Sequence, residues 1–265
     1  MTELALSILA SGDPLDHVVQ HELFKIGPIL FTNHMLMLII AGVMLLVLLP
    51  LIAKQRSMVP SGVRNFFEAI CVFLREEVAR PILGENTDRF IKFIWTIFFF
   101  ILFCNVLGMI PIDGLILFLS FGKLQHYGGT ATSNIWVTGT LAGCAFLMIH
   151  VSGIRQQGVF SYIKNFIPHV PIPLMPFMYV LELIGSLVKP FALAIRLFAN
   201  MMAGHTVLGA LLILGLAAKS IPIAGATVVG CAALSLLELF VAFLQAYIFT
   251  FLATLFIGAA VQPEH

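Results

Sequence analysis

The sequence predicts an all-α, polytopic membrane protein with one upright N-terminal span, an interfacial amphipathic helix, a hairpin of two spans and two long, tilted, antiparallel helices. Three observations lead to this prediction. Of the 265 residues, 60% are hydrophobic and only 10% are charged, which excludes an ordinary soluble domain. Residues 33–53 are uncharged over the length needed to cross a bilayer. Two apolar stretches near the C-terminus are each much longer than one span requires.

The composition also indicates which partners and which kinds of functional site the protein is expected to have. A net charge of +1 gives no reason to expect a nucleic-acid partner, whereas the lipid bilayer is the expected surrounding. The cysteines show no C-x-x-C spacing, so we interpret Cys71, Cys104, Cys144 and Cys231 as small core residues and expect no metal site and no cofactor. Walker, zinc-protease and G-x-S-x-G motifs are absent from the sequence.

The chain is expected to begin outside the membrane and then to cross it. Residues 1–32 are rich in acidic side chains and carry a single cation, Lys25. We therefore predict a polar extramembrane segment over 1–32 and a membrane domain over 33–265, with the first span at 33–53. The loop after this span is basic, which places it on the inner side.

Residues 60–82 combine an apolar side with a charged side. Val63, Phe66, Ile70 and Leu74 recur at helical spacing, and the positions between them are rich in Arg and Glu. The segment is too charged to span a membrane, so we predict a helix that lies in the interface and ends near Pro81 and Gly84.

Two spans are predicted next, at 90–111 and 134–152. The loop between them contains one cation, which suits the outer side. The second of these spans contains Gly139-x-x-x-Gly143, a small-residue pattern that lets membrane helices approach closely.

Residues 172–218 and 222–262 are apolar and helical in pattern but lack a convincing loop. At ~1.5 Å per residue, the first would form a helix of about 70 Å, more than twice the ~30 Å hydrocarbon core. Either each stretch contains a break, for which Pro190 is a candidate, or both helices are strongly tilted. The turn between the stretches favours two long antiparallel helices.

The register of this hairpin pairs its polar residues. Counted from a turn centred near Ser220, Arg196 lies about as far before the turn as Gln245 lies after it. His205 and Glu238 are related in the same way. Antiparallel packing therefore predicts that Arg196 is level with Gln245 and that His205 is roughly level with Glu238.

The same helix separates its polar residues by face. Glu182, Lys189 and Arg196 follow one another at seven-residue intervals and share one stripe. His205 lies on the opposite side at ~100° per residue. We therefore divide the polar side chains into an inner and an outer set, with Arg196 between them. The inner set is Glu182 and Lys189, and the outer set is His205, Glu238, Asn105 and Asp113.

The orientation follows from the basic residues. Most Lys and Arg side chains outside the apolar stretches lie in segments assigned to the inner side. The N-terminus is therefore predicted to be outside and the C-terminus inside, so that Glu182 lies near the inner face and His205 near the outer face.

The chemistry centres on Arg196. A charged side chain at membrane depth costs at least ~2.5–3.5 kcal/mol, and a guanidinium stays protonated at any accessible pH. A fixed cation of this kind can attract an ionised carboxylate on a passing partner and favour release of its proton, and its field repels a proton that crosses directly. His205 and Glu238 can exchange protons. Two polar paths, each open to one side and offset around Arg196, would form two half-channels.

Simpler explanations remain open from the residues alone. Arg196 could form a structural ion pair with Glu238 or Glu182, in which case it would tolerate replacement. Lys189 could extend its ammonium to the interface, and Asn200 and Gln245 could hydrogen-bond between helices. A stand-alone cation/proton transporter is the alternative function, although transporters usually show internal repeats and none is convincing here.

A resemblance to a known family adds to this reasoning. The segment Lys189-Pro190-x5-Arg196-Leu197-Phe198-x-Asn200-Met201-x-Ala203-Gly204-His205, together with Leu244-Gln245-Ala246-Tyr247-Ile248-Phe249, closely resembles subunit a of the F-type ATP synthase. The segment Asn105-x5-Pro111-Ile112-Asp113 is also similar to that family. Some members carry Glu where this chain has His205 and His where it has Glu238, so the exchange keeps one acid and one imidazole. Gly108 stands where some members place an acid.

The resemblance implies a function in detail, in which the chain is not an enzyme on its own and ATP chemistry belongs to partner subunits. It implies a proton-conducting stator subunit of the F0 sector beside a ring of c subunits, with the peripheral-stalk b subunits and the other ATP synthase subunits as further partners. Arg196 matches the family's essential arginine, and Glu182 and Lys189 would line the inner half-channel. The outer path and the interface with the c subunits would include Asn200, His205, Glu238, Gln245 and Asn105. An energy-coupling membrane is implied, and we expect the bacterial plasma membrane rather than the mitochondrial inner membrane.

Overall fold

The computed structural model of the chain describes residues 22–26, 29–53, 62–110, 130–165, 174–217 and 220–261. Nearly all of these residues are helical. Five helical segments among them are long and apolar enough to cross a membrane. The predicted all-α, polytopic membrane fold is therefore confirmed.

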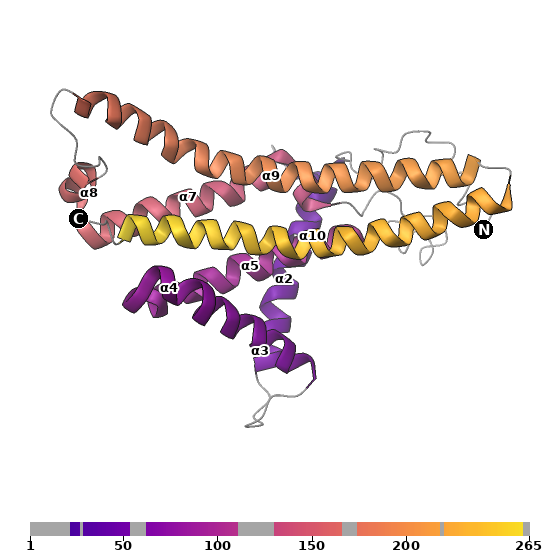
Figure 1. Cartoon of the computed structure of the whole chain (residues 1–265), viewed down its shortest axis with the longest axis horizontal. Coiled ribbons are helices and arrows are strands. Elements are labelled where there is room, and N and C mark those ends of the chain that lie inside the picture. The colour runs from indigo at the N-terminus through magenta and orange to yellow at the C-terminus, as the bar shows by residue number, and fades with distance from the viewer. Residues whose placement is uncertain are drawn as a thin grey trace. The chain divides into compact units, whose positions relative to one another are not determined.

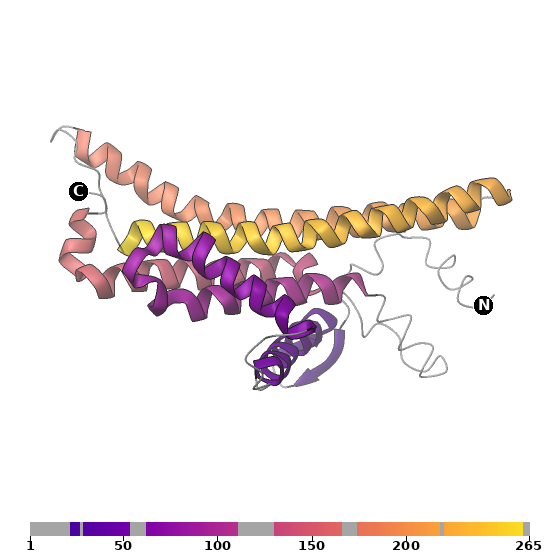
Figure 2. The same ribbon diagram turned by 60° about the horizontal axis from the view of Figure 1, so that its bottom comes forward.

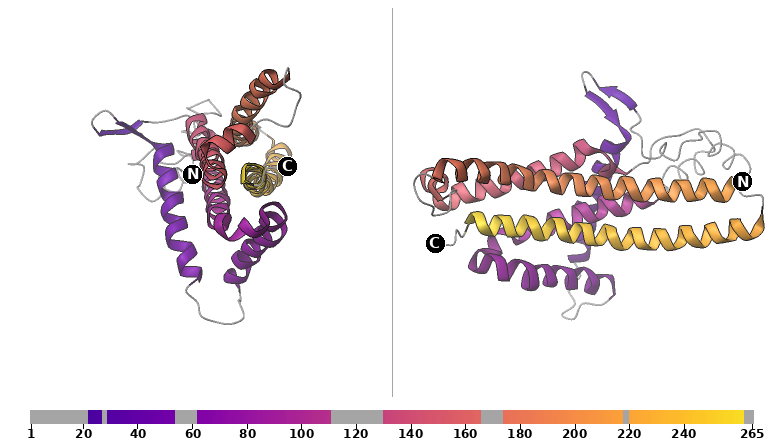
Figure 3. Two further views of the ribbon diagram at one scale, coloured as in Figure 1. Left: turned by 90° about the vertical axis from the view of Figure 1, so that its left-hand side faces the viewer. Right: turned by 45° about the horizontal axis from the view of Figure 1, so that its top comes forward.

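A short antiparallel strand pair precedes the first long helix. Strand β1 (Glu22–Ile26) pairs with β2 (Ile29–Thr32), and β2 continues directly into helix α2 (Asn33–Ala53), as Figure 3 shows. The Thr32 hydroxyl accepts a hydrogen bond from the Met35 amide at 3.5 Å, which satisfies one free N–H at the start of α2. The bounds of α2 match the predicted span 33–53, whereas the strands were not predicted.

The predicted amphipathic helix consists of several joined turns. They are α3 (Val63–Phe73), the π-helix η1 (Leu74–Ala79), α4 (Arg80–Leu83) and the 3₁₀ turn η2 (Gly84–Asn86), and they lead into helix α5 (Thr87–Met109). The chain reverses at Gly84, whose positive φ of 54° favours glycine. Pro81 lies inside the first turn of α4 and does not end the helix. The placement of this segment in the interface stays a prediction.

The α3–η1 segment packs against α5 through one face (Figure 1). The indole N–H of Trp95 donates to the carbonyl oxygen of Cys71 at 3.0 Å, and the rings of Phe67 and Phe99 lie 5.5 Å apart. On the opposite face, charged side chains pair along the helix, as Arg64 does with Glu68 at 3.5 Å. The apolar and charged sides that the sequence predicted are therefore both present.

Helix α7 (Ile135–Gln157) is joined to α8 (Val159–Asn165) by Gly158, which has a φ of 80°. The predicted close-packing role of Gly139 and Gly143 is not found among the described residues. No atom lies within 4 Å of the place where a Cβ at either position would sit. Both glycines instead line an apolar cavity of about 450 Å³.

Helices α9 (Met175–Ala217) and α10 (Ile221–Val261) are each continuous, with 43 and 41 residues. Helix α9 runs through Pro190 without a break. Of the two alternatives left open by the sequence, internal breaks are therefore excluded. At ~1.5 Å per residue, each helix is about twice as long as the ~30 Å hydrocarbon core, so its tilt in the membrane stays the prediction that fits.

The chain divides into two compact units. Unit 1 comprises Met1–Leu45, Ile101–Val137 and Leu197–Gln245, and unit 2 comprises Leu46–Phe100, Thr138–Arg196 and Ala246–His265. The predicted division into an extramembrane segment over 1–32 and a membrane domain over 33–265 follows a different criterion, and it stays a prediction.

In unit 1, the parts of α9 and α10 next to their turn run antiparallel, side by side (Figure 2). Close approach depends on small residues. A Cβ on Gly215 would collide with the side chain of Thr227, and a Cβ on Gly204 would lie 2.6 Å from Glu238 Oε1. These contacts fix the hairpin register within unit 1.

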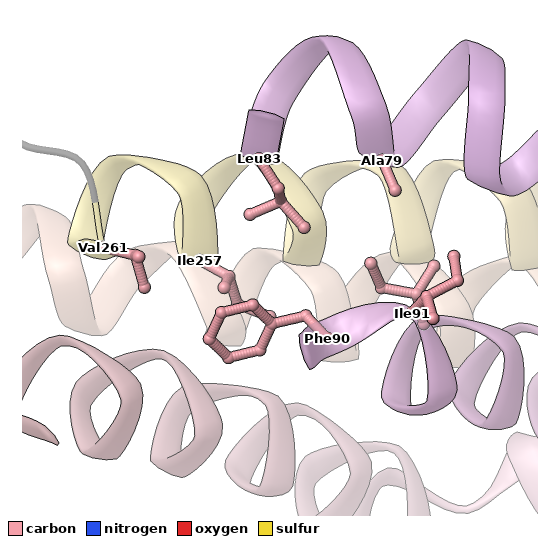
Figure 4. Close-up of a cluster of buried hydrophobic side chains, with 7 residues drawn as sticks. Ala79, Leu83, Phe90, Ile91, Ile257 and Val261 are labelled. Carbon is pink, nitrogen blue, oxygen red and sulfur yellow. The ribbon is translucent and has the colours of Figure 1, made fainter. Parts of the chain in front are cut away.

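In unit 2, a buried cluster joins the end of α10 to α4 and the start of α5 (Figure 4). Phe90 is at its centre, and Leu83 and Ile257 contribute side chains that are fully buried. A Cβ on Gly258 would lie 2.7 Å from Ile82 Cγ2, so the backbones approach closely here. The cluster anchors the last turns of α10.

Candidate functional site

The outer set is brought together in unit 1. His205 on α9 and Glu238 on α10 face each other, with 3.7 Å between His205 Nε2 and Glu238 Oε1. Their side chains are only 15% and 9% exposed. The prediction that His205 lies level with Glu238 in the antiparallel hairpin is therefore confirmed.

Thr130 is a member of this group that the sequence did not reveal. Its hydroxyl lies 2.8 Å from His205 Nε2, and its backbone carbonyl lies 2.9 Å from Nδ1 of His34 at the start of α2. Both Thr130 and His34 are 2% exposed. Since a carbonyl can only accept, His34 Nδ1 is the donor in its hydrogen bond, and this bond holds Thr130 against His205.

The 3₁₀ turn η3 (Ala131–Ser133) continues the group toward Asn105. The Thr132 hydroxyl donates to Asn105 Oδ1 at 2.9 Å, and Asn105 Nδ2 donates to the carbonyl of Ala242 on α10 at 3.4 Å. Asn105 is fully buried. The predicted association of Asn105 with the outer set is therefore supported by contacts to α10, although its role is not tested by them.

Several buried polar atoms of unit 1 have no hydrogen-bond partner among the described residues. They are Asn200 Nδ2, Glu238 Oε1 and Gln245 Nε2. An unsatisfied buried polar atom costs ~1–3 kcal/mol, so such atoms usually meet water or a ligand. All three belong to the predicted outer path. Asp113, the remaining member, lies outside the described residues.

The inner set lies in unit 2. Lys189 Nζ is 3.8 Å from Glu182 Oε1, and the same ammonium lies 5.1 Å from the ring centroid of Phe256 on α10. Both side chains are about two-fifths exposed, at 43% and 40%. Screening by solvent makes such an ion pair weak, so it contributes little to stability.

Glu182 and Lys189 border a cavity of about 140 Å³, which has room for several water molecules. Helices α7, α8, α9 and α10 contribute its other polar and apolar walls. The lining residues are Phe146, Ile149, His150, Gln157, Tyr162, Glu182, Ser186, Lys189, Pro190, Phe256, Ala259 and Ala260. The sequence did not reveal that His150, Gln157 and Tyr162 share this cavity with the inner set.

A hydrogen bond of 2.7 Å joins His150 Nδ1 on α7 to the Tyr162 hydroxyl on α8. Burial, and secondarily the negative charge of Glu182, raise the pKa of the Tyr162 hydroxyl above its usual value. Tyr162 also packs on Gly153, where a Cβ would collide with its ring. The hydroxyl therefore keeps its proton at physiological pH.

Arg196 is the last residue of the α9 segment in unit 2. It is exposed, and in the part of the chain that the structure describes no ion pair of its guanidinium is found. Glu182 and Glu238, the carboxylates considered for a structural ion pair, lie beside Lys189 and His205 instead. The predicted pairing of Arg196 with Gln245 joins residues of different units and stays a prediction.

Among the described residues, no group of three or more His, Cys, Asp or Glu side chains could hold a metal ion. The four cysteines are free thiols, and they range from the buried Cys104 to the exposed Cys144.

The chain is similar in sequence to one family of known proteins. The family model described as "ATP synthase A chain" matches residues 35–258. The chain is 40% identical to "ATP synthase subunit a" of Anaeromyxobacter sp. (strain Fw109-5), over 96% of this chain and 62% of the relative. It is 41% identical to the protein of that name from Chloroherpeton thalassium, over 95% of this chain and 77% of the relative. The protein of that name from Myxococcus xanthus is 40% identical, over 88% and 74%. The chain thus spans about three-fifths of the Anaeromyxobacter protein's length.

Proposed function

We propose that this chain, which belongs to the ATP synthase A chain family, is the proton-conducting stator subunit of the F0 sector of an F-type ATP synthase. In this function it passes protons to and from carboxylates on a rotating ring of c subunits. It thereby couples the proton-motive force to rotation, whereas ATP chemistry takes place on partner subunits. The chain itself is non-catalytic in this proposal.

The observation that carries the proposal is that Arg196 is exposed and has no ion pair among the described residues. Its guanidinium is exposed on an apolar helix, and no described carboxylate neutralises it. A fixed cation at membrane depth is too costly to keep without a partner or a task. A carboxylate on a passing c subunit would supply that partner, and the positive field would favour release of its proton.

The outer half-channel is assigned to the protonatable and polar group of unit 1. His205 and Glu238 can exchange a proton across 3.7 Å through small movements or one water molecule. The unsatisfied atoms of Asn200 and Gln245 are buried within the chain, where water molecules are suitable partners. Asn105 positions the group. Asp113 is assigned to the outer half-channel from the sequence alone.

The inner half-channel is assigned to the cavity of unit 2 that Glu182 and Lys189 border. A cavity that has room for several water molecules and is lined by an acid can deliver protons to the inner side or collect them from it. Because the two polar groups belong to different compact units, the two half-channels would be built from separate parts of the chain.

The remaining assignments concern the surroundings. The apolar helices and the bacterial relatives support a multi-pass protein of a bacterial plasma membrane. The distribution of basic residues supports an N-terminus outside and a C-terminus inside. The c-ring, the peripheral-stalk b subunits and the other ATP synthase subunits are the proposed protein partners.

The test is an Arg196→Ala substitution in the intact complex in membrane vesicles. ATP-driven proton pumping is measured together with passive proton permeability. We expect pumping to be lost although the complex assembles, and an added passive leak would support the barrier role of the guanidinium. Arg155→Ala, which removes an exposed cation from the last turn of α7, is the matched control and should pump normally. Unimpaired pumping in the Arg196 variant would refute the proposal and favour a structural role.

A further inference from the structure

The inner cavity contains more proton chemistry than Glu182 and Lys189 supply. His150 and Tyr162 border the same cavity and are joined by a 2.7 Å hydrogen bond. An imidazole and a phenol that are hydrogen-bonded to each other and exposed to a water-sized space can pass a proton between them and that water.

We propose that His150 and Tyr162 form a proton-transfer pair on the wall of the inner half-channel, between the inner solution and Glu182. The proposal rests on the function proposed above, because it needs protons to pass through this cavity. Its own basis is the hydrogen bond and the shared cavity in unit 2.

The transfer balances without any further reactant. When His150 carries its hydrogen on Nε2, Nδ1 accepts the hydrogen bond from the Tyr162 hydroxyl. A hydronium ion in the cavity, formed with a proton from the inner solution, then gives its proton to the phenol oxygen as the phenol passes its own proton to Nδ1, which leaves a water molecule and an imidazolium. In reverse, the imidazolium returns a proton through the hydroxyl to water and onward to the Glu182 carboxylate. The hydroxyl holds one proton before and after each step.

Tyr162 suits the part of a relay because it stays protonated. The pKa of its hydroxyl is raised by burial and by Glu182, so the group transmits a proton and does not become a lasting anion. The packing of its ring on Gly153 keeps the hydroxyl directed at His150.

The titratable groups that face His150 come from two neighbouring helices. Tyr162 faces it from α8, and Glu182 and Lys189 face the same cavity from α9. The α10 residues that line the cavity, Phe256 among them, carry no titratable group. His150 therefore shares the cavity with one carboxylate, one ammonium and the Tyr162 hydroxyl.

A purely structural explanation is that the hydrogen bond only holds α8 against α7. Tyr162→Phe and His150→Gln separate this from a relay, since Phe keeps the ring on Gly153 and Gln keeps a hydrogen-bonding group. The initial rate of ATP-driven pumping is measured in inverted vesicles with the whole complex, as a function of the pH on the inner-face side. Rates are divided by the amount of assembled complex, so that a change in assembly does not affect the comparison.

We expect Tyr162→Phe to slow pumping by about tenfold, since positioned proton transfer typically contributes ~10²–10⁴-fold and cavity water bypasses part of it. We expect His150→Gln to flatten the pH dependence of pumping over the range in which the imidazole exchanges its proton. Tyr179→Phe, on α9 and outside the cavity lining, should retain both the rate and the pH profile.

A wild-type rate and pH profile in both variants would overturn the proposal. So would a decrease in both variants in which His150→Gln keeps the shape of the wild-type pH profile, because that outcome indicates a structural role. The Arg196→Ala measurement separates this failure from failure of the proposed function. If Arg196→Ala abolishes pumping and the cavity variants do not change it, only the relay is wrong.

Discussion

Gly204 provides a sharp test of the outer group, because its lack of a side chain leaves room for the carboxyl group of Glu238. A Cβ at position 204 would lie 2.6 Å from Glu238 Oε1 and 3.0 Å from its Cδ. The carboxyl group is the far end of a flexible side chain, so it can move aside at little cost to the fold. Gly204→Ala therefore displaces the carboxyl group and leaves the helices in place.

The size of the effect follows from the distances. Ordinary contact needs about 3.4 Å, so Oε1 must move by about 0.8 Å, and its distance from His205 Nε2 increases from 3.7 Å to about 4.5 Å if it moves directly away. At an effective dielectric constant of ~20, the attraction between a carboxylate and an imidazolium weakens by about 0.8 kcal/mol, which is about fourfold in an equilibrium constant. We expect the pumping rate to fall by a similar factor.

The assay is the initial rate of ATP-driven proton pumping per assembled complex, with Gly225→Ala as the matched control. Gly225 also lies in a helix of unit 1, but no atom lies within 4 Å of its Cβ position, so the control should pump at the normal rate. A normal rate in Gly204→Ala, with an unchanged dependence on the pH of the outer side, would show that the closeness of Glu238 to His205 is not needed for conduction.

Two further predictions concern unit 1. Gly215→Ala should destabilise the α9–α10 hairpin by ~1–3 kcal/mol, because its Cβ collides with Thr227. In a double-mutant cycle, Thr227→Ala should restore most of this loss, and thermal unfolding of the purified complex measures it. Thr130→Ala removes the hydroxyl next to His205 Nε2 and should change the outer-side pH profile of pumping, whereas Thr130→Ser should preserve it.

The elements of the fold were predictable wherever hydropathy alone determines them. Helix α2 covers the predicted span 33–53, an apolar and uncharged stretch of the length that a membrane requires. The pairing of His205 with Glu238 was also predictable, since only three residues separate two unbroken helices and leave the register little freedom. The strand pair β1–β2 could have been suggested by two short runs on either side of Gly27-Pro28, a turn dipeptide in the sequence.

The missed residues depend on contacts between distant parts of the chain. Thr130 reaches His205 only because η3 is held to α2 by His34, and no periodicity in the sequence encodes that approach. His150 and Tyr162 lie in separate helices and meet because the chain turns at Gly158. A signal was present in the sequence, namely polar aromatic side chains within or next to apolar helices, but it does not specify which partners they contact.

The case for two half-channels over a single pore depends finally on α9 itself. Between Lys189 and His205 the helix carries only two strongly polar side chains, Arg196 and Asn200. At ~1.5 Å per residue, Lys189 and His205 are about 24 Å apart along the helix axis. Proton transfer requires groups within hydrogen-bond reach, and a guanidinium that stays protonated cannot accept a proton in the middle of this gap. In the proposed function, a proton that enters at one polar group reaches the other on a separate carrier, and a moving carboxylate that Arg196 attracts meets that requirement.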